Sequence, residues 1–243
     1  GRDLIFPHHE NEIAQSESFT CEQFAKIWMH AGMITINGEK MSKSVGNIKS
    51  INHVLESWGP NVARLFCISG HYSKPIDYTE DLLKENLIKL RQIETCYYEL
   101  RLAEEQEQSE DISSLLAESR EKFDAALNDD FNTPLGLSVF FNMIKTINSF
   151  AADEKITKQM AKQALPVLEY MLEVLGIKVQ TVSDEEVKSI FDLINKRETL
   201  RAEKQFDEAD KIRDQIAGLG ISLIDHKNRT LWMKKEPIKA ENQ

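Results

Sequence analysis

At residues 33–44 the chain reads Met-Ile-Thr-Ile-Asn-Gly-Glu-Lys-Met-Ser-Lys-Ser. The β-branched start followed by Asn-Gly predicts a β-hairpin, because Asn-Gly fits the tight turns that join two strands. Residues 40–47 continue as a polar loop that contains glycine. Lys40 and Lys43 stand three residues apart on this loop, and two ammonium groups can clamp a polyphosphate and stabilise leaving pyrophosphate. The alternative is an ordinary solvated turn.

Upstream of this loop, residues 8–16 follow Pro7 and predict a helix start. His8 and Glu12 are four residues apart and share one helical face, as a pair of metal ligands must. Two ligands do not complete a zinc site, so at least one more, preferably a thiolate, has to come from elsewhere. The alternative is a charged helix start without a metal.

Downstream of the loop, apolar periodicity predicts a mainly helical chain. We expect helices at 51–57, 60–70, 79–108, 112–128, 133–151, 156–175, 184–200 and 205–218, with a loop at 71–77. Short β-type runs at 221–224 and 230–233 predict a terminal hairpin, and the tail after Pro237 is expected to be loose. One apolar stripe is predicted to be core: Leu135, Val139, Phe140, Met143 and Ile147.

A third motif covers residues 201–214, where Arg, Lys and Asp share a helical face near Phe206. Such a face can recognise unstacked RNA bases, and stacking on an aromatic ring is worth roughly 1–3 kcal/mol per base. From the residues alone, a salt-bridged surface helix with Phe206 in the core is the favoured interpretation.

Composition fits a soluble globular protein, because 41% of the 243 residues are hydrophobic and 29% are charged. No apolar stretch is long enough to predict a membrane span. The net charge of −10 disfavours a nucleic-acid binder, but residues 80–130 hold 15 acidic and 6 basic residues and supply most of it. These acidic helices are expected to form a solvated face.

The three cysteines predict no disulfide framework, which favours a reducing cytoplasm. They also form no C-x-x-C pair, so no zinc ribbon or finger is predicted: Cys21, Cys67 and Cys96. The first residues resemble neither a signal nor a transit peptide, and they lack an initiator Met, so we expect a piece of a longer protein.

Taken together, these segments resemble the cysteinyl-tRNA synthetases, a family of class I aminoacyl-tRNA synthetases. The resemblance follows the family's order over nearly the whole chain. It rests on F-P-H-H-E-N-E-I-A-Q-S-E within residues 1–17, Trp28-Met29-His30 leading to G-E-K-M-S-K-S-V-G-N, the stretch 64–78, D-F-N-T-P at 130–134, R-A-E-K-Q-F-D-E-A-D-K-I-R-D, Gly220-Ile221, and Thr230-x-Trp232.

The resemblance implies a two-step chemistry. The carboxylate of cysteine attacks the α-phosphate of ATP, which carries Mg²⁺, and the cysteinyl group then passes to the 3′ end of cysteine tRNA. A catalytic zinc binds the substrate thiolate and separates cysteine from serine. The implied site residues are these: His8 and Glu12 as zinc ligands, Lys43 on the ATP phosphates with Lys40 assisting, Asp3 and His30 near the site, Arg201, Phe206, Asp210 and Asp225 on the anticodon, and Trp232 supporting them.

The resemblance also implies an architecture and its gaps. Residues 1–48 would be the C-terminal end of a class I Rossmann-type catalytic domain, 49–78 a helical connecting fold, 79–182 a helical tRNA-binding bundle, and 183–243 a small α+β anticodon-binding module with a tail. The family's H-x-G-H motif and two zinc cysteines are absent. We therefore expect a C-terminal half that forms no cysteinyl-adenylate alone and binds zinc weakly or not at all. Residues 1–48 are expected not to fold fully by themselves.

Two other interpretations stay open. A non-catalytic RNA-binding module would need only the helical part, and a related ligase that joins cysteine to an amino sugar shares the catalytic signatures. Residues 183–243 argue against the amino-sugar ligase, which needs no anticodon-binding end. For the synthetase we expect a cytoplasmic monomer whose partners are cysteine tRNA, cysteine and ATP. Residues 225–229 depart from the Gly-containing turn usual in the family, which leaves the last hairpin's geometry open.

Overall fold

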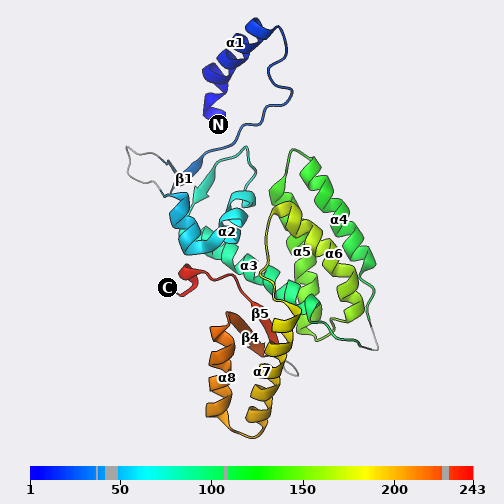
Figure 1. Cartoon of the computed structure of the whole chain (residues 1–243). Coiled ribbons are helices and arrows are strands. Elements are labelled where there is room, and N and C mark those ends of the chain that lie inside the picture. The colour runs from blue at the N-terminus through cyan, green and yellow to red at the C-terminus, as the bar shows by residue number, and fades with distance from the viewer. Residues whose placement is uncertain (37, 42–48, 107–108, 226–229, 243) are drawn as a thin grey trace.

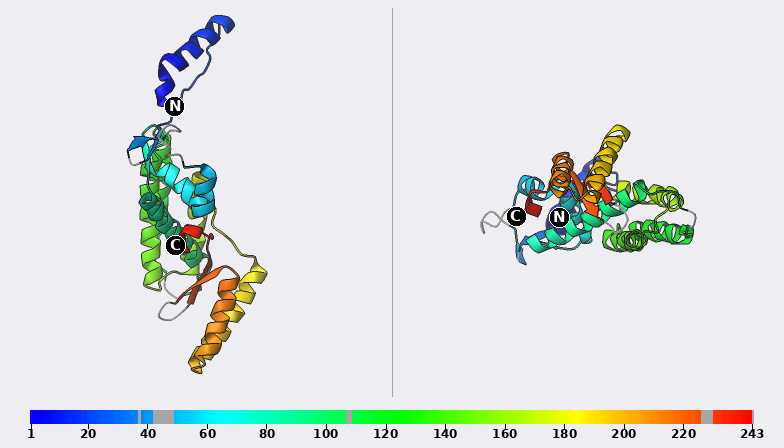
Figure 2. Two further views of the ribbon diagram at one scale, coloured as in Figure 1. Left: turned by 90° about the vertical axis from the view of Figure 1, so that its left-hand side faces the viewer. Right: turned by 90° about the horizontal axis from the view of Figure 1, so that it is seen from below.

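The computed structural model describes residues 1–36, 38–41, 49–106, 109–225 and 230–242. The molecule is elongated (Figure 1). The first helix, α1 (Glu10–Thr20), lies at one end, a small module of two helices and two strands lies at the other, and a helical body lies between them. The side view in Figure 2 shows the same order.

The N-terminal segment is held to the body by a small sheet. A 3-10 turn (Arg2–Leu4) and a π-helical turn (Ile5–His9) precede α1, and an extended stretch then leads to β1 (Ile34–Ile36). β1 pairs antiparallel with β2 (Glu39–Lys40), which confirms the predicted hairpin.

A third strand, β3 (Ile76–Tyr78), pairs parallel with β1 and was missed by the sequence analysis, which predicted a loop at 71–77. Three residues after a proline carry little strand signal of their own, and their partner lies about forty residues away. The two segments approach so closely at Gly32 that a Cβ there would lie 2.0 Å from the Lys74 carbonyl oxygen. The parallel pairing of β1 with β3 is therefore set by tertiary packing and not by local sequence.

Helix α2 (Ile51–Ser69) confirms the two predicted helices, because it is broken at Gly59, whose φ is +75°. The Ser50 side chain caps its start by accepting from the His53 N–H. Pro60 then opens the second half, which suits a residue without an amide donor.

Helix α3 (Glu80–Arg101) is capped by Thr79 and is the central element of the body. It ends at Arg101, so the predicted extension to residue 108 is wrong. The following residues pair instead with the chain before α6: the Lys158 N–H donates to the Glu104 carbonyl at 2.9 Å. A tertiary partner has overridden the helical propensity of this charged stretch.

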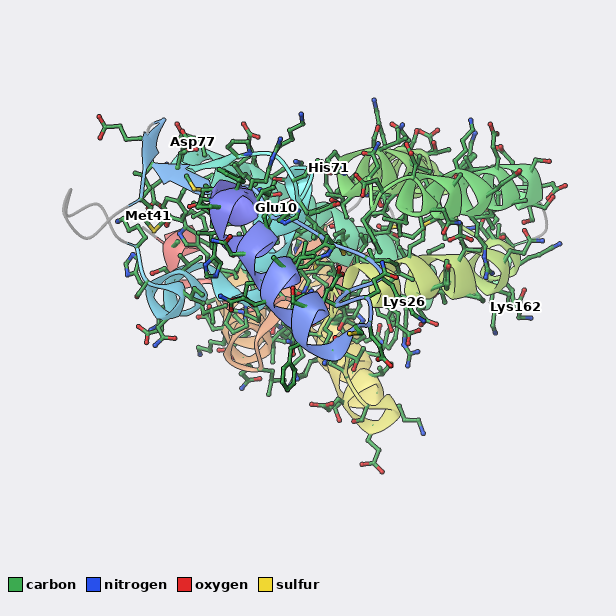
Figure 3. All side chains as sticks on the ribbon, turned by 90° about the horizontal axis from the view of Figure 1, so that it is seen from above. Glu10, Lys26, Met41, His71, Asp77 and Lys162 are labelled. Atoms are coloured by element: carbon green, nitrogen blue, oxygen red, sulfur yellow. The ribbon has the colours of Figure 1, made fainter. Side chains whose placement is uncertain are left out.

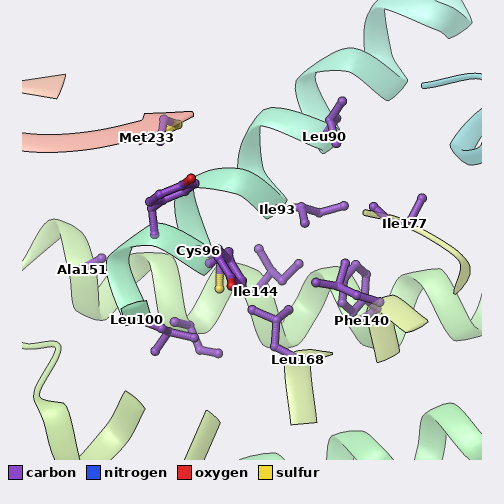
Figure 4. Packing of buried hydrophobic residues seen from close by; sticks show 14 of the residues in the cluster. Leu90, Ile93, Cys96, Leu100, Phe140, Ile144, Ala151, Leu168, Ile177 and Met233 are labelled. Carbon is purple, nitrogen blue, oxygen red and sulfur yellow. The ribbon is translucent and has the colours of Figure 1, made fainter. Parts of the chain in front are cut away.

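The bundle is completed by α4 (Ser113–Asn128), α5 (Thr133–Ala152) and α6 (Lys158–Leu175), close to the predicted bounds. α3 crosses α5 and α6 over a core of apolar side chains (Figure 4). Phe140, Met143 and Ile147 are fully buried as predicted, whereas Leu135 is 49% exposed, because it lies in the first turn of α5.

The acidic stretch was expected to be a solvated face, and this is wrong for two of its residues. Glu94 and Glu99 on α3 are 1% and 0% exposed. Charge count along the sequence could not show this, because α3 runs through the middle of the body and has neighbours on several sides.

The C-terminal module consists of α7 (Asp184–Ala202), α8 (Phe206–Gly218) and an antiparallel pair, β4 (Ile221–Asp225) and β5 (Thr230–Lys234). A capping box between Ser183 and Glu186 starts α7. The terminal hairpin is confirmed, and its predicted turn at 226–229 lies outside the described residues.

The tail after Pro237 is not loose as predicted. It forms a 3-10 turn (Lys239–Asn242), and Ile238 is only 4% exposed. The tail packs back onto α2 and α3, where Ile238 joins the core and Ala240 packs against it. Two small or isolated apolar residues among polar ones give no sequence signal for such docking.

Candidate functional site

The predicted metal pair lies on α1 and the turn before it. His8 Nε2 and Glu12 Oε1 are 3.7 Å apart, on side chains that are about half exposed. Two ligands of one tetrahedral zinc, each at about 2.0 Å, are separated by roughly 3.3 Å, so this pair fits two corners of such a site. Among the described residues no group of three or more His, Cys, Asp or Glu could hold a metal. The remaining ligands would have to come from elsewhere.

A ring cluster lies beside this pair. His9 Nδ1 and His30 Nε2 share a hydrogen bond of 3.0 Å, and Trp28 stacks on His30 with an interplanar angle of 6°. Burial, then the neighbouring His30, lowers the pKa of His9. The sequence analysis singled out His30 but missed His9, because no spacing rule links residues 21 positions apart.

Asp3 lies in the turn that is fixed to the same region. The Arg2 N–H donates to the Ala31 carbonyl at 3.0 Å, which brings the stretch 2–3 next to residues 30–31. Figure 3, seen from above, shows α1 with Glu10 above the body and His71 between the sheet and the bundle. The residues next in sequence to the Arg2–Ala31 hydrogen bond are Asp3 and His30.

The loop that is predicted to bind phosphates follows β2 in the sequence. Lys40 is the last residue of β2, while Lys43 lies outside the described residues. The hairpin that leads into the loop is pinned by Asp77, whose Oδ1 accepts from Thr35 Oγ1 at 2.6 Å and from the Gly38 N–H at 2.9 Å. These hydrogen bonds lower the pKa of Asp77, so its carboxylate holds the hairpin as an anion. Asp77 belongs to the missed strand β3 and was not predicted.

At the other end of the molecule, Asp225 gathers two arginines. Arg197 binds it with both terminal nitrogens, at 3.1 Å to Oδ1 and 2.9 Å to Oδ2, and Arg201 reaches Oδ2 at 3.3 Å. Thr230 Oγ1 donates to the same carboxylate at 3.1 Å. Hydrogen bonding by Arg197 is the main cause that lowers the pKa of Asp225.

Arg197 is the residue that sequence reasoning missed in this cluster. It is only 4% exposed, whereas the side chain of Arg201 is 44% exposed. Arg197 therefore fixes Asp225 from below, and Arg201 remains open to a ligand. The available signal was that Arg197 precedes Arg201 by one helical turn.

The other predicted anticodon residues divide by exposure. Phe206 opens α8 and is 59% exposed, so the interpretation that placed it in the core is wrong; Ala209, Ile212 and Ile216 face inward instead. Asp210 is exposed, and its charge contributes to the raised pKa of Arg197. Trp232 is 1% exposed and packs against Tyr98 and Phe191, which suits support of the hairpin and not direct contact with a base.

Comparison with known proteins assigns the class. Residues 1–87 match the family model described as "tRNA synthetases class I (C) catalytic domain", and residues 122–180 match the DALR domain. The fold resembles that of an Agrobacterium radiobacter LeuRS solved in a ternary complex with tRNA and LeuAMS. The TM-score is 0.56 at 16% identity, over 71% of this chain and 25% of that one. Residues 1–87 thus carry the pattern of a class I aminoacyl-tRNA synthetase catalytic domain.

The relatives of this chain within that class are cysteine–tRNA ligases. The chain is 38% identical to the enzyme of Caldicellulosiruptor saccharolyticus over 93% of its own length and 50% of the relative's. It is 37% identical to that of Thermococcus onnurineus over 96% of its length and 52% of the relative's. The chain belongs to the cysteine–tRNA ligase family and spans about half the length of the curated relatives it matches. Within the described part of the chain, no helix is long and apolar enough to cross a membrane.

Proposed function

We propose that this chain is the part of a cysteine–tRNA ligase that carries the ATP-phosphate loop, one half of the zinc site and the anticodon-binding module. The observation that carries the proposal is the Asp225 cluster, and Phe206 lies exposed at the start of the neighbouring helix α8. Asp225 can accept hydrogen bonds from base amino groups, Arg201 can donate to base carbonyls, and Phe206 can stack on an unstacked base.

The division of the chain follows from this function. Residues 1–48 would close the catalytic site, 49–78 would connect it to the bundle, 79–182 would lie along the tRNA, and 183–243 would hold the anticodon. Asp210 would join Arg201 and Asp225 at the bases, and Trp232 would keep β5 rigid beneath them.

At the catalytic end, Lys43 would bind the phosphates of Mg²⁺-bound ATP with help from Lys40, and both would stabilise charge on departing pyrophosphate. Asp3 and His30 would line the same site. His8 and Glu12 would hold a zinc ion together with ligands from outside this chain. Such an ion, when bound, supplies a soft Lewis acid that prefers the thiolate of cysteine over the hydroxyl of serine. We place this function in the cytoplasm, in a monomer.

The test is a binding titration of the chain against cysteine tRNA and against the same tRNA with an altered anticodon, at one fixed salt concentration. We expect a preference for the native anticodon. Phe206→Ala should weaken binding of the native tRNA about 5- to 150-fold, the equivalent of one lost stacked base. Phe19→Ala, at an equally apolar and 90% exposed position on α1, is the matched control. Equal binding of both tRNAs would contradict the proposal for residues 183–243.

A second measurement separates a ligase part from a non-catalytic RNA-binding module. Cysteine-dependent pyrophosphate exchange is measured with the chain alone and after adding the complementary half of a relative. We expect exchange only in the mixture, and loss of that exchange on Lys43→Ala. No exchange in the mixture, with anticodon preference retained, would favour the non-catalytic module.

A further inference from the structure

The C-terminal residues pack against the body of the molecule, although the sequence predicted a loose tail. We call residues 235–242 the strap: it leaves β5, crosses α3 and ends against α2. In Figure 1 it runs from β5 back to the body, so the C-terminus lies beside α2 and far from the tip of the module.

The first anchor of the strap is its backbone at Glu236. The Glu236 N–H donates to Glu94 Oε1 at 2.9 Å, and its carbonyl accepts from Arg91 at 3.0 Å. Arg91 and Glu94 stand three residues apart on α3 and also bind each other at 2.6 Å. Further along the strap, Glu241 Oε1 accepts from Arg91 Nε at 3.1 Å. The Arg91–Glu94 ion pair on α3 therefore binds both the backbone N–H and the backbone carbonyl of Glu236.

The second anchor is the Glu236 side chain, which enters the kink of α2. The carboxylate is buried, and its Oε2 accepts from Asn61 Nδ2 at 2.6 Å. A Cβ on Gly59 would lie 2.2 Å from Glu236 Oε1 and 2.8 Å from Ile238 Cδ1. The glycine kink thus makes room for this carboxylate, which faces the start of the second half of α2, where a helix favours negative charge.

Asn61 also holds the other connection to the C-terminal module. Its Nδ2 donates to the Lys178 carbonyl at 2.8 Å, and its Oδ1 accepts from the Lys178 N–H at 3.0 Å. Lys178 lies on the linker between α6 and α7. The entry into the module and the exit from it are therefore bound by one side chain, on the helix that follows the phosphate loop.

From these contacts we infer that the strap is a positioning device: Glu236 and Asn61 fix the angle between the module α7–α8–β4–β5 and helix α2. The purpose of this device rests on the proposed function. A ligase must hold its anticodon-binding module and its phosphate loop at a set separation to engage both ends of one tRNA. The geometry itself involves no RNA. The module also meets the body where Trp232 of β5 packs against Tyr98 of α3. Without the Glu236 and Asn61 anchors, we expect the module to pivot about this contact.

The experiment measures the distance between α2 and the module with spin labels. The exposed positions Glu56 on α2 and Gln215 on α8 are changed to cysteine and labelled, with Cys21→Ser and Cys67→Ser to remove the exposed native thiols. Cys96 is buried and stays. Distance distributions are recorded by pulsed electron resonance for the full chain, for Glu236→Ala and for Asn61→Ala.

We expect one narrow distance peak in the parent and its loss to a broad distribution in both variants. Circular dichroism should show unchanged helix content. Glu236→Gln keeps an acceptor for Asn61 and should keep the narrow peak, whereas Glu236→Met fills similar space without that acceptor and should lose it. Glu85→Ala, an exposed glutamate on the same docking helix α3, is the matched control and should leave the peak narrow.

Narrow peaks in both alanine variants would overturn the proposal. Loss of helix content together with the peak would also overturn it, because the strap would then be needed for folding and not for positioning. Failure of the proposed function is seen separately, as absent tRNA preference in a chain whose distance peak still depends on Glu236.

Discussion

The N-terminal segment, residues 1–34, and the bundle of α3 to α6 both contain helix and many large apolar side chains, but only the bundle buries them. Phe6, Phe19 and Ile27 are 79%, 90% and 82% exposed, and α1 has no buried residue. Phe140, Met143 and Ile147 of α5 are 0% exposed. A helix forms from local preference in both regions, but an apolar face becomes a core only where a partner surface exists.

We expected residues 1–48 not to fold fully alone, and the exposed apolar side chains of residues 1–34 bear on the same question. Large apolar groups in the open contribute nothing to stability, whereas each buried one contributes about 1.5–3 kcal/mol. Four predictions break or sharpen this contrast, beginning with the largest.

Truncation of one phenylalanine in each region should give opposite results. Phe140→Ala removes a fully buried ring and should lower the free energy of unfolding by about 3–5 kcal/mol. Phe19→Ala should change it by less than about 0.5 kcal/mol, because the ring is 90% exposed. Urea titration followed by circular dichroism measures both. Similar losses for the two variants would mean that α1 packs against the body in solution.

A buried and an exposed arginine should also differ in their contribution to the free energy of unfolding. Arg197→Ala leaves the Asp225 carboxylate without its two main donors and should cost about 1–3 kcal/mol of unfolding free energy. Arg2→Ala removes one hydrogen bond, to the Ser73 carbonyl, from an exposed side chain in the N-terminal segment and should cost under about 0.5 kcal/mol. Thermal unfolding compares them. An equal cost would show that the N-terminal turn contributes to the global fold.

The buried glutamates at the strap should make the free energy of unfolding depend on pH. Burial raises the pKa of Glu236 and of Glu94 above their ordinary value of 4.5. A raised pKa in the folded state favours the protonated form, so this contribution is full below 4.5 and is lost as pH rises through the folded pKa. Glu236→Gln cannot ionise.

The free energy of unfolding of Glu236→Gln should therefore gain on that of the parent as pH rises from about 4 to 7. The charged groups that act on Glu236 are Glu94 and Arg91, and both are kept in the variant, as are their own partners Lys235 and Glu241. Urea titration at several pH values measures the difference. A difference that stays constant over this range would contradict the prediction.

The smallest effect belongs to the metal pair. His8→Ala should change the free energy of unfolding by under about 0.5 kcal/mol, because an exposed i, i+4 pair contributes little. It should matter only with zinc: in a mixture with the complementary half, zinc retained after dialysis should fall, as measured by atomic absorption. The control is Glu17→Ala, because Glu17 lies on the same helix outside the His8–Glu12 pair. This variant should retain zinc.

The residues predicted for the site come from local patterns and family motifs, whereas the contacts that surround them join distant segments of the chain. His8 with Glu12 follows from a spacing of one helical turn, and Arg201 was named from the resemblance to the family. His9 against His30, Asp77 under the hairpin and Arg197 beneath Asp225 join segments that lie 21 to 42 residues apart. No short pattern encodes such contacts, because they arise when separate elements pack.

The sequence by itself determined the order of the helices, both hairpins, the break of α2 at Gly59 and the family, because caps, turns and motifs act within a few residues. Only the tertiary structure decided that Phe206 is exposed whereas Trp232 and Glu94 are buried, and that the tail docks on α2. Burial depends on which surfaces meet, and that is a property of the assembled fold.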